Sequence, residues 1–229
     1  MSPRRKITPK VKICGITSYE DAAAAIAAGA DLLGFVCDEN DPRYIGPEQL
    51  QEWIGELHHA YPTDAEKPAY RTVGIFTDKP AAYIAAIMAL TGLDWVQLNG
   101  AEPVSVLAQL HKRAYKAIHP RAYKDADAEA SFYAAHSPRF GPRLLIDAYR
   151  PDMDDADPRP DWEIAKELAR FRSILLSGGL TPQNVAAAVR TVHPWGVDVR
   201  EGVEKTPGRK DVAAMQDFVR KAKTALREQ

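Results

Sequence analysis

The sequence has few of the features that mark secreted or membrane-bound proteins. It contains only two cysteines, Cys14 and Cys37, and such sparse usage does not describe a disulfide framework. A reducing, cytoplasmic environment is therefore expected. The basic start of the chain is not followed by an apolar signal region, and no apolar run is long enough to cross a bilayer. We expect no membrane partner and interpret residues 1–10 as a flexible tail.

An excess of charge of one sign is also missing. The 30 Lys and Arg residues nearly balance the 31 Asp and Glu residues, so there is no electrostatic reason to expect a nucleic-acid partner. A composition of 45% hydrophobic and 27% charged residues is typical of a folded globular chain. The length of 229 residues is close to the roughly 250 of a single (β/α)8 barrel, so we expect one domain over residues 1–229.

Short apolar runs alternate with segments of helical period along the whole chain. The expected strands are residues 11–14, 32–37, 72–76, 95–98, 115–118, 144–147, 173–176 and 196–199. The expected helices are residues 19–28, 47–58, 80–90, 103–111, 125–136, 162–171, 182–192 and 212–226, with Ser18 and Thr181 as N-caps and Pro47, Pro80, Pro103 and Pro182 in first turns. Eight units in strict alternation favour a single (β/α)8 TIM barrel, because a closed barrel leaves no sheet edge. A doubly wound sheet is the weaker alternative, and the dinucleotide fingerprint is missing after the first strand.

Two potential proton-transfer groups lie at the carboxyl ends of expected strands, where the active site of such a barrel gathers. Cys14 lies where a strand gives way to a glycine turn, and as a base its thiol would need help to ionise at neutral pH. Asp147 ends an aliphatic run, a surrounding that would raise its pKa and suit it to donate a proton. The structural alternatives are a buried apolar Cys14 and a solvated Asp147. His119 also ends a strand, but a lone histidine gives no reason to include it in the mechanism.

Other segments indicate binding of anionic groups. Gly178 and Gly179 follow the seventh expected strand, and Arg200 and Gly202 follow the eighth. A phosphate site made by these two loops recurs in this fold, although two ordinary tight turns are the alternative. Arg43 lies in the loop after the second strand and could hold a carboxylate by a planar two-point contact, unless it is an exposed arginine without a specific partner.

Stretches spread over nearly the whole chain resemble those of a known family. They are residues 12–17, 29–36, 42–45, 73–76, 96–98, 145–147, 176–180 and 196–199, and in this order and spacing they resemble the phosphoribosylanthranilate isomerases of tryptophan biosynthesis. The resemblance implies that Cys14 is the general base, that Asp147 is the general acid, and that Arg43 binds the anthranilate carboxylate. It also implies that the two glycine loops hold the phosphate.

The reaction implied by the resemblance is an Amadori rearrangement. It converts N-(5-phosphoribosyl)anthranilate to the corresponding carboxyphenylamino-deoxyribulose phosphate. Asp147 would protonate the ribose ring oxygen, and Cys14 would remove the proton from the sugar C2 of the resulting imine. Neither a metal nor a redox cofactor is expected, and the expected partner is the phosphosugar substrate of a monomer or homodimer.

Three segments depart from the pattern of the family. Asn99 replaces a usual histidine, residues 152–160 replace a glycine-rich run, and Arg200 with Glu201 replaces small hydroxyl residues. We expect the Glu201 carboxylate to turn away from the phosphate, which it would otherwise repel. The alternatives are another phosphosugar isomerase or synthase on the same barrel, and a non-catalytic phosphosugar-binding paralogue.

Overall fold

A computed structural model describes residues 10–62, 69–119, 123–138, 141–147 and 162–229 of the chain. Residues 1–9 of the expected tail and the run 152–160 lie outside this part of the chain. Lys10, which was expected in the tail, instead begins the first strand. Among the described residues, no helix is long and apolar enough to cross a membrane.

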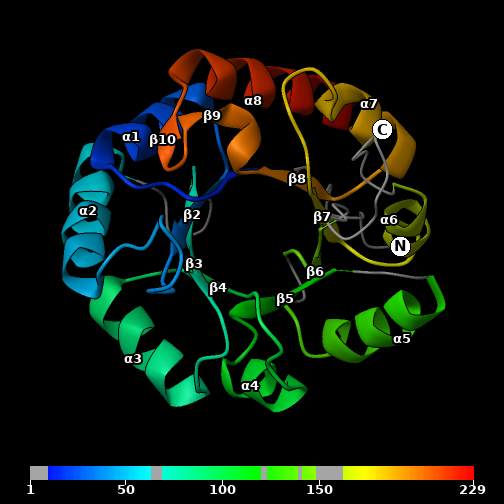
Figure 1. Ribbon diagram of the computed structural model, residues 1–229, viewed down its shortest axis with the longest axis horizontal. Coiled ribbons are helices and arrows are strands. Elements are labelled where there is room, and N and C mark those ends of the chain that lie inside the picture. The colour runs from blue at the N-terminus through cyan, green and yellow to red at the C-terminus, as the bar shows by residue number, and fades with distance from the viewer. Residues whose placement is uncertain (1–9, 63–68, 120–122, 139–140, 148–161) are drawn as a thin grey trace, which may run out of the picture.

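Eight parallel strands form a closed barrel in which each strand pairs with its neighbours in chain order (Figure 1). They are β1 Lys10–Ile13, β2 Leu32–Val36, β3 Arg71–Phe76, β4 Trp95–Leu98, β5 Ala114–Ile118, β6 Leu144–Asp147, β7 Ile174–Ser177 and β8 Gly196–Val199. The barrel closes between β1 and β8, where Lys12 pairs in register with Asp198. The prediction of a (β/α)8 TIM barrel is confirmed, and the open doubly wound sheet is excluded by this closure.

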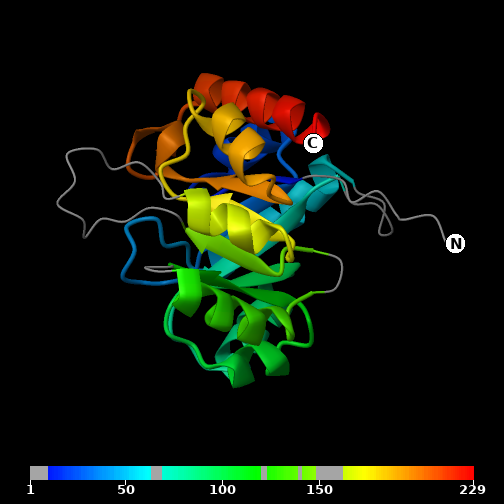
Figure 2. The ribbon, with the colours of Figure 1, turned by 90° about the vertical axis from the view of Figure 1, so that its right-hand side faces the viewer.

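The helices surround the strands on the outside of the barrel (Figure 2). They are α1 Tyr19–Ala28, α2 Pro47–Ala60, α3 Ala81–Thr91, α4 Val104–Gln109, α5 Tyr123–Ala134, α6 Trp162–Ala169, α7 Val185–Val192 and α8 Val212–Arg227. The cap predicted at Ser18 is confirmed, since its side chain accepts a hydrogen bond from the Asp21 amide at 3.1 Å. The expected helix order is thus present throughout the described chain.

Helices α4 and α7 are shorter than expected. Helix α4 ends before residue 111 because His111 and Lys112 adopt left-handed backbone angles, with φ of 50° and 62°. Helix α7 begins three residues later than expected, because the Asn184 side chain accepts a hydrogen bond from the Thr181 amide at 2.8 Å and holds residues 181–184 in a turn. Thr181 Oγ1 accepts a hydrogen bond from the Gln183 amide at 3.2 Å and so caps this turn, whereas Asn184 takes the N-cap position of α7. The prediction that Thr181 caps α7 itself was wrong.

A short excursion between β8 and α8 was not predicted. It consists of the 3-10 helix η1 (Glu201–Val203) and a two-stranded hairpin of β9 (Glu204–Thr206) and β10 (Arg209–Lys210). The segment is too short to show a period that a sequence pattern could reveal. It matters for the site because it carries Glu204 and Lys210 back toward the barrel.

Two hydrophobic layers hold the barrel together. The larger layer lies between strands and helices, and a smaller cluster includes Leu32, Val73, Tyr115, Ala117, Leu145 and Leu175, all at most 2% exposed. Residues of one strand that are two positions apart point to the same face. The side chains of this smaller cluster come from five of the eight strands, as expected for the packed interior of such a barrel.

Candidate active site

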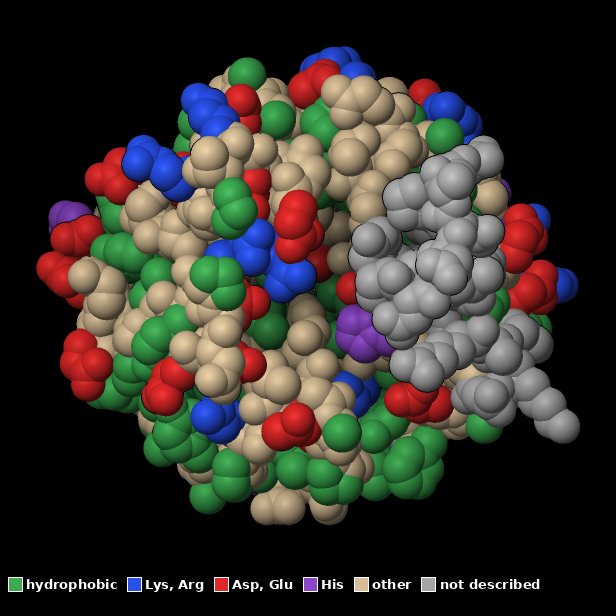
Figure 3. Space-filling model, viewed as in Figure 1, with side chains coloured by type: hydrophobic (Ala, Val, Ile, Leu, Met, Phe, Trp, Pro, Cys, Tyr) green, Lys and Arg blue, Asp and Glu red, His purple; other side chains and the backbone are tan. Residues whose placement is uncertain are grey.

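A cavity of about 640 Å³ opens at the carboxyl ends of the barrel strands. Its described lining includes Cys14 after β1, Gln97 on β4, Asp147 on β6, Ser177 on β7 and Asp198 on β8. In the space-filling view the cavity is a hollow near the centre of one face, and acidic and basic side chains adjoin at its edge (Figure 3). The site expected from the strand ends is therefore a single concave surface.

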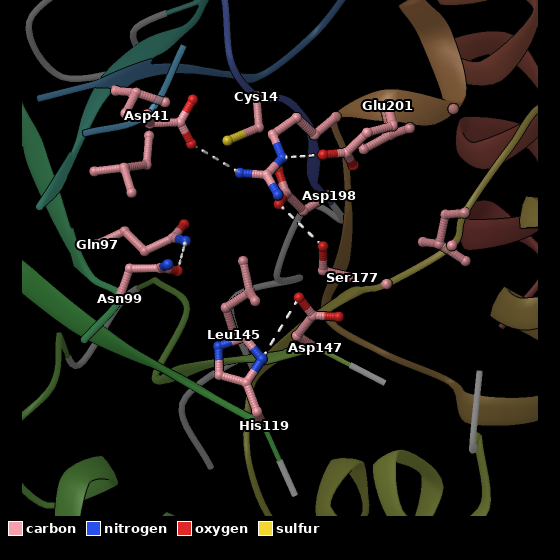
Figure 4. Close-up of a pocket in the computed structure, with 18 of the residues that line it drawn as sticks. Cys14, Asp41, Gln97, Asn99, His119, Leu145, Asp147, Ser177, Asp198 and Glu201 are labelled. Carbon is pink, nitrogen blue, oxygen red and sulfur yellow. Dashed lines mark hydrogen bonds and ion pairs between the residues drawn. The ribbon is translucent and has the colours of Figure 1, made fainter. Parts of the chain in front are cut away.

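Cys14 lies at the inner wall of this cavity. Its amide donates to the Val199 carbonyl at 2.9 Å, which ties the first residue after β1 to the last residue of β8. Gly15 follows with φ of 68°, a left-handed conformation that suits glycine and turns the chain into the loop before α1. The Cys14 sulfur points toward the cavity (Figure 4), although the residue is only 5% exposed. Cys14 is thus both buried and accessible from the site.

The environment of Cys14 has opposing effects on its ionisation. Burial raises the pKa of the Cys14 thiol above its ordinary value, and the Asp198 carboxylate adds to the rise. The positive charges of Lys12 and Arg200 act in the opposite direction. Any base function of this thiol therefore depends on nearby cations.

A buried polar network lies beside Cys14, and the sequence reasoning missed it. We call it the floor network; its members are Lys12, Gln97, Tyr115, Ser177 and Asp198. The fully buried Lys12 Nζ donates to Asp198 Oδ1 and to Gln97 Oε1, both at 3.0 Å. The hydroxyls of Tyr115 and Ser177 donate to Gln97 Oε1 at 3.1 Å and to Asp198 Oδ2 at 3.2 Å. The network joins five strands, β1, β4, β5, β7 and β8, beneath the cavity.

The floor network keeps Lys12 charged. Burial on its own would lower the pKa of Lys12, but the charges of Asp198, Cys14 and Tyr115 raise it above the ordinary value of a lysine. A signal was present in the sequence, because Lys12 interrupts the apolar strand between Val11 and Ile13. A charged residue at an inward position of a barrel strand requires a partner.

The structure brings Asp147 and His119 together on another side of the cavity. His119 Nδ1 lies 3.6 Å from Asp147 Oδ2, and both residues line the cavity (Figure 4). The side chains are 53% and 28% exposed, so water reaches both. The sequence pattern gives His119 no role in the mechanism, yet in the structure it is a direct neighbour of the candidate acid.

The two glycine loops predicted to bind phosphate meet at one edge of the cavity. Gly178 and Gly179 have φ of 90° and 61°, and the Gly179 carbonyl accepts a hydrogen bond from the Asn184 side chain at 2.9 Å. A Cβ atom at Gly202 would lie 1.9 Å from the Leu180 carbonyl oxygen, so the two loops touch through their backbones. Both loops line the cavity. Close backbone contact of this kind is what an anion-binding cradle requires.

Arg43 is placed differently from the other predicted site residues. It is 7% exposed and lies outside the set of described residues that line the cavity. Its Nε and Nη2 donate to the two carboxylate oxygens of Glu204 at 2.9 and 2.8 Å, a bidentate pair. Lys210 donates to the same carboxylate at 2.9 Å. Burial would raise the pKa of Glu204, but the hydrogen bonds from both cations hold it below its ordinary value.

Arg200 and Glu201 form the exposed side of this group of charges. Arg200 Nε donates to Glu201 Oε1 at 2.5 Å, and Arg200 Nη1 lies 3.6 Å from Asp41 Oδ2. The Glu201 side chain is 62% exposed, which agrees with the expected outward direction, although its carboxylate remains at the edge of the cavity. We call this set the rim cluster; its members are Asp41, Arg43, Arg200, Glu201, Glu204 and Lys210.

Asn99 occupies the position at which the sequence departs from the family after β4. Its Oδ1 accepts a hydrogen bond from Gln97 Nε2 at 3.1 Å, and both side chains line the cavity (Figure 4). Gln97 also accepts from Lys12, so Asn99 extends the floor network to the cavity surface. Among the described residues, no group of three or more His, Cys, Asp and Glu side chains is placed to hold a metal ion.

A closed parallel barrel whose strand ends bring a thiol, a carboxyl group and two glycine loops to one cavity has the architecture of a TIM-barrel enzyme. A model of the N-(5'-phosphoribosyl)anthranilate isomerase family matches residues 11–221. An isomerase of this name from Geobacter metallireducens is 41% identical over 216 residues, which cover 93% of this chain and 98% of that protein.

Solved structures agree with this assignment. Phosphoribosyl anthranilate isomerase from Thermotoga maritima matches with a TM-score of 0.80 and 33% identity, covering 94% of this chain and 99% of that one. Another structure, of such an isomerase in complex with reduced 1-(o-carboxyphenylamino)-1-deoxyribulose 5-phosphate, matches with a TM-score of 0.78 and 32% identity over 94% and 99% of the two chains. The chain belongs to the phosphoribosylanthranilate isomerase family, and the prediction of an isomerase of tryptophan biosynthesis is confirmed at that level.

Proposed function

We propose that the chain catalyses the Amadori rearrangement of N-(5'-phosphoribosyl)anthranilate, with Asp147 as general acid and Cys14 as general base. The observation that carries the proposal is that a thiol and a carboxyl group line one cavity at two strand ends, beside a glycine cradle. A relative with 32% identity over nearly the whole chain is known in complex with the reduced carboxyphenylamino-deoxyribulose phosphate. Two free, buried cysteines suit a reducing, cytoplasmic environment, which we include in the proposal.

The proposed reaction includes two separate proton transfers, one from Asp147 to the substrate and one from the substrate to Cys14. Asp147 gives its proton to the ribose ring oxygen, the C1–O bond breaks, and the anthranilate nitrogen forms an imine with C1. The Cys14 thiolate then takes the proton from C2, which leaves a neutral enolamine. The enolamine becomes the ketone when C1 gains a proton and the C2 hydroxyl loses one, and proton exchange with water returns Asp147 and Cys14 to their starting forms. Asp147 emerges from the aliphatic wall of β6 and Cys14 from β1, so acid and base approach the substrate from different strands.

The substrate anions find opposite charges and donors around this centre. We place the phosphate on the backbone amides near Gly179 and Gly202, with Arg200 beside it. We place the anthranilate carboxylate at Arg43, whose Nε and Nη2 hold Glu204 while Nη1 lies 3.7 Å from Asp41. An arginine has five N–H donors in a planar fork, so the substrate carboxylate can bind at Nη1 by taking the place of the Asp41 carboxylate.

The proposal is tested by generating phosphoribosylanthranilate in place and following the loss of its fluorescence with purified protein. Wild type should turn over the substrate, and Cys14→Ala and Asp147→Asn should each lower the rate by about 10² to 10⁴ while the circular dichroism spectrum stays unchanged. Near wild-type rates in either variant would remove that residue from the mechanism. No turnover by wild type would favour another phosphosugar isomerase or synthase, or a non-catalytic paralogue.

The phosphate site has a separate test in Gly202→Ala. A Cβ atom would push against the Leu180 carbonyl oxygen and force the two loops apart. A loss of about 1.4 kcal/mol in the contact between the displaced amides and the anion corresponds to a tenfold loss of affinity. Inhibition by inorganic phosphate should weaken accordingly. Unchanged inhibition in a folded variant would show that the anion binds elsewhere.

A further inference from the structure

Lys12 is a buried charged side chain to which the proposed reaction gives no role. It is 0% exposed and stands two positions before Cys14, so both side chains point to the interior of the barrel. Gly34 on β2 shows how close they lie. A Cβ atom at Gly34 would be 3.0 Å from Cys14 Sγ and 3.1 Å from Lys12 Cε. The thiol and the end of the lysine therefore occupy the space left free by one glycine.

The lysine is held in place by fixed acceptors. Two of the three donors of its ammonium group bind Asp198 Oδ1 and Gln97 Oε1 at 3.0 Å. These acceptors are themselves oriented by the Ser177 and Tyr115 hydroxyls. An ammonium that is buried, paired and restrained in this way is a permanent positive charge at a fixed position.

We propose that Lys12 is a positioning residue for proton abstraction, and that its ammonium is the fixed positive charge against which the Cys14 thiolate forms. The inference rests on the proposed role of Cys14 as the base. The proton moves between the substrate C2 and the Cys14 sulfur, whereas Lys12 keeps its own protons throughout. Asp198 and Gln97 contribute by keeping the ammonium in place.

Other charged groups that face Cys14 come from three elements. Asp198 on β8 acts against thiolate formation, Arg200 after β8 acts in favour of it, and Tyr115 on β5 belongs to the same network. Gly34 on β2 contributes no charge. Lys12 has the largest effect in favour of ionisation, through its charge and through a hydrogen bond, and both oppose the effect of burial on the pKa of Cys14. Arg200 is 40% exposed, so solvent screens it more than Lys12.

The test is Lys12→Met, which keeps an unbranched side chain one atom shorter and removes its charge. The rate of alkylation of Cys14 by iodoacetamide is measured from neutral to alkaline pH without substrate, with mass spectrometry to identify the modified cysteine. An opposite charge this close shifts a pKa by about one unit or more, so alkylation at neutral pH should fall about tenfold or more. Cys37 does not interfere, because burial raises its pKa to about 12.

Lys116→Met is the matched control. Lys116 is also buried at 3% exposure and pairs with Glu102 at 3.3 Å. It donates to the carbonyls of residue 98 on β4, residue 100 after β4 and residue 117 on β5. Its loss should lower stability without changing the ionisation of Cys14. The double variant of Lys12→Met with Asp198→Asn removes both charges of the pair and serves if the single variant fails to fold.

An unchanged thiol pKa in folded Lys12→Met, relative to wild type, would overturn the inference. For the double variant the reference is Asp198→Asn alone, because Asp198 and Lys12 act on the thiol in opposite directions, and an unchanged pKa against that reference would overturn it as well. The measurement needs no turnover, so its outcome is independent of the proposed reaction. Full activity of Cys14→Ala would refute the base, whatever Lys12 does to the thiol. A dead Cys14→Ala variant together with an unchanged thiol pKa in Lys12→Met would refute only the role of Lys12.

Discussion

Two groups of charged side chains border the same cavity and differ in how far water reaches them. In the floor network, Lys12 and Asp198 have side chains 0% and 5% exposed and contact each other at 3.0 Å. In the rim cluster, exposure rises from Lys210 at 0% and Glu204 at 5%, through Arg200 at 40%, to Glu201 at 62%. The same kinds of ion pair therefore stand in two different dielectric surroundings.

Because the two groups of charges differ in solvent exposure, they are suited to different roles within one site. The floor network holds few charges, which are fixed in position and shielded from water, so each interacts strongly with its neighbours. They are therefore suited to setting the ionisation of a neighbouring group such as Cys14. Charges toward the outside of the rim cluster are screened and have several partners, since Arg43 faces Asp41, Glu201 and Glu204. They can exchange partners when an anionic substrate enters. Substitutions should therefore cost more stability in the floor network than at the outer rim.

The largest effect on stability is expected from Asp198→Asn. This change leaves the buried Lys12 ammonium without its carboxylate, and breaking a buried pair costs about 3 to 5 kcal/mol. The free energy of unfolding, measured with urea, should fall by that amount. Adding Lys12→Met should recover part of the loss, because the second change removes the unpaired charge. A loss below about 1 kcal/mol in the single variant would contradict the distinction between floor and rim.

Arg43→Lys should have the next largest effect. Lysine cannot reproduce the bidentate contact with Glu204, and hydrogen bonds to charged groups contribute about 1.5 to 3 kcal/mol. We expect a comparable fall in stability and weaker binding of an anthranilate-containing ligand, with ribose 5-phosphate bound as before. Calorimetric titration of both ligands checks the contrast. Equal losses for the two ligands would mean that Arg43 acts on the phosphate or on folding alone.

The sequence was informative where the relevant signal is local. The strand order, the turn after Cys14 and the glycines at 178 and 179 each follow from neighbouring residues, and the structure bears out their placement. The partners of charged groups could not be predicted in this way. Lys12 and Asp198 are 186 positions apart, and Arg43 and Glu204 are 161 apart. Such pairs exist only because the barrel closes and the hairpin after β8 folds back.

His119 illustrates a second reason why some features of the site could not be predicted from the sequence. A histidine before a proline at a strand end carries no distinctive pattern, and only the pairing of β5 with β6 brings it within 3.6 Å of Asp147. The boundary of α7 shows a third reason. Thr181 and Asn184 are both good capping residues, and in the structure their side chains bond to the amides of Gln183 and Thr181 within the turn that precedes α7.

Glu204→Gln tests the buried part of the rim cluster through the pH dependence of the free energy of unfolding. The pKa of Glu204 is lowered in the folded protein, so its ionised form contributes stability above its unfolded value of about 4.3. This contribution is lost as the pH falls through the lower folded value. The glutamine variant should be less stable at neutral pH and should lose less stability on acidification. Parallel stability curves for the two proteins would show that Glu204 is not coupled to Arg43 and Lys210.

The smallest effect is expected from Glu201→Ser. The Glu201 carboxylate is 62% exposed, and exposed ion pairs contribute about 0 to 1 kcal/mol. The free energy of unfolding should change by less than about 1 kcal/mol, and inhibition by inorganic phosphate should change only slightly, because Arg200 already neutralises the carboxylate. Titration with phosphate at low and high salt measures this. A large gain in phosphate affinity would show that the carboxylate faces the anion, and it would favour a ligand other than a simple phosphosugar.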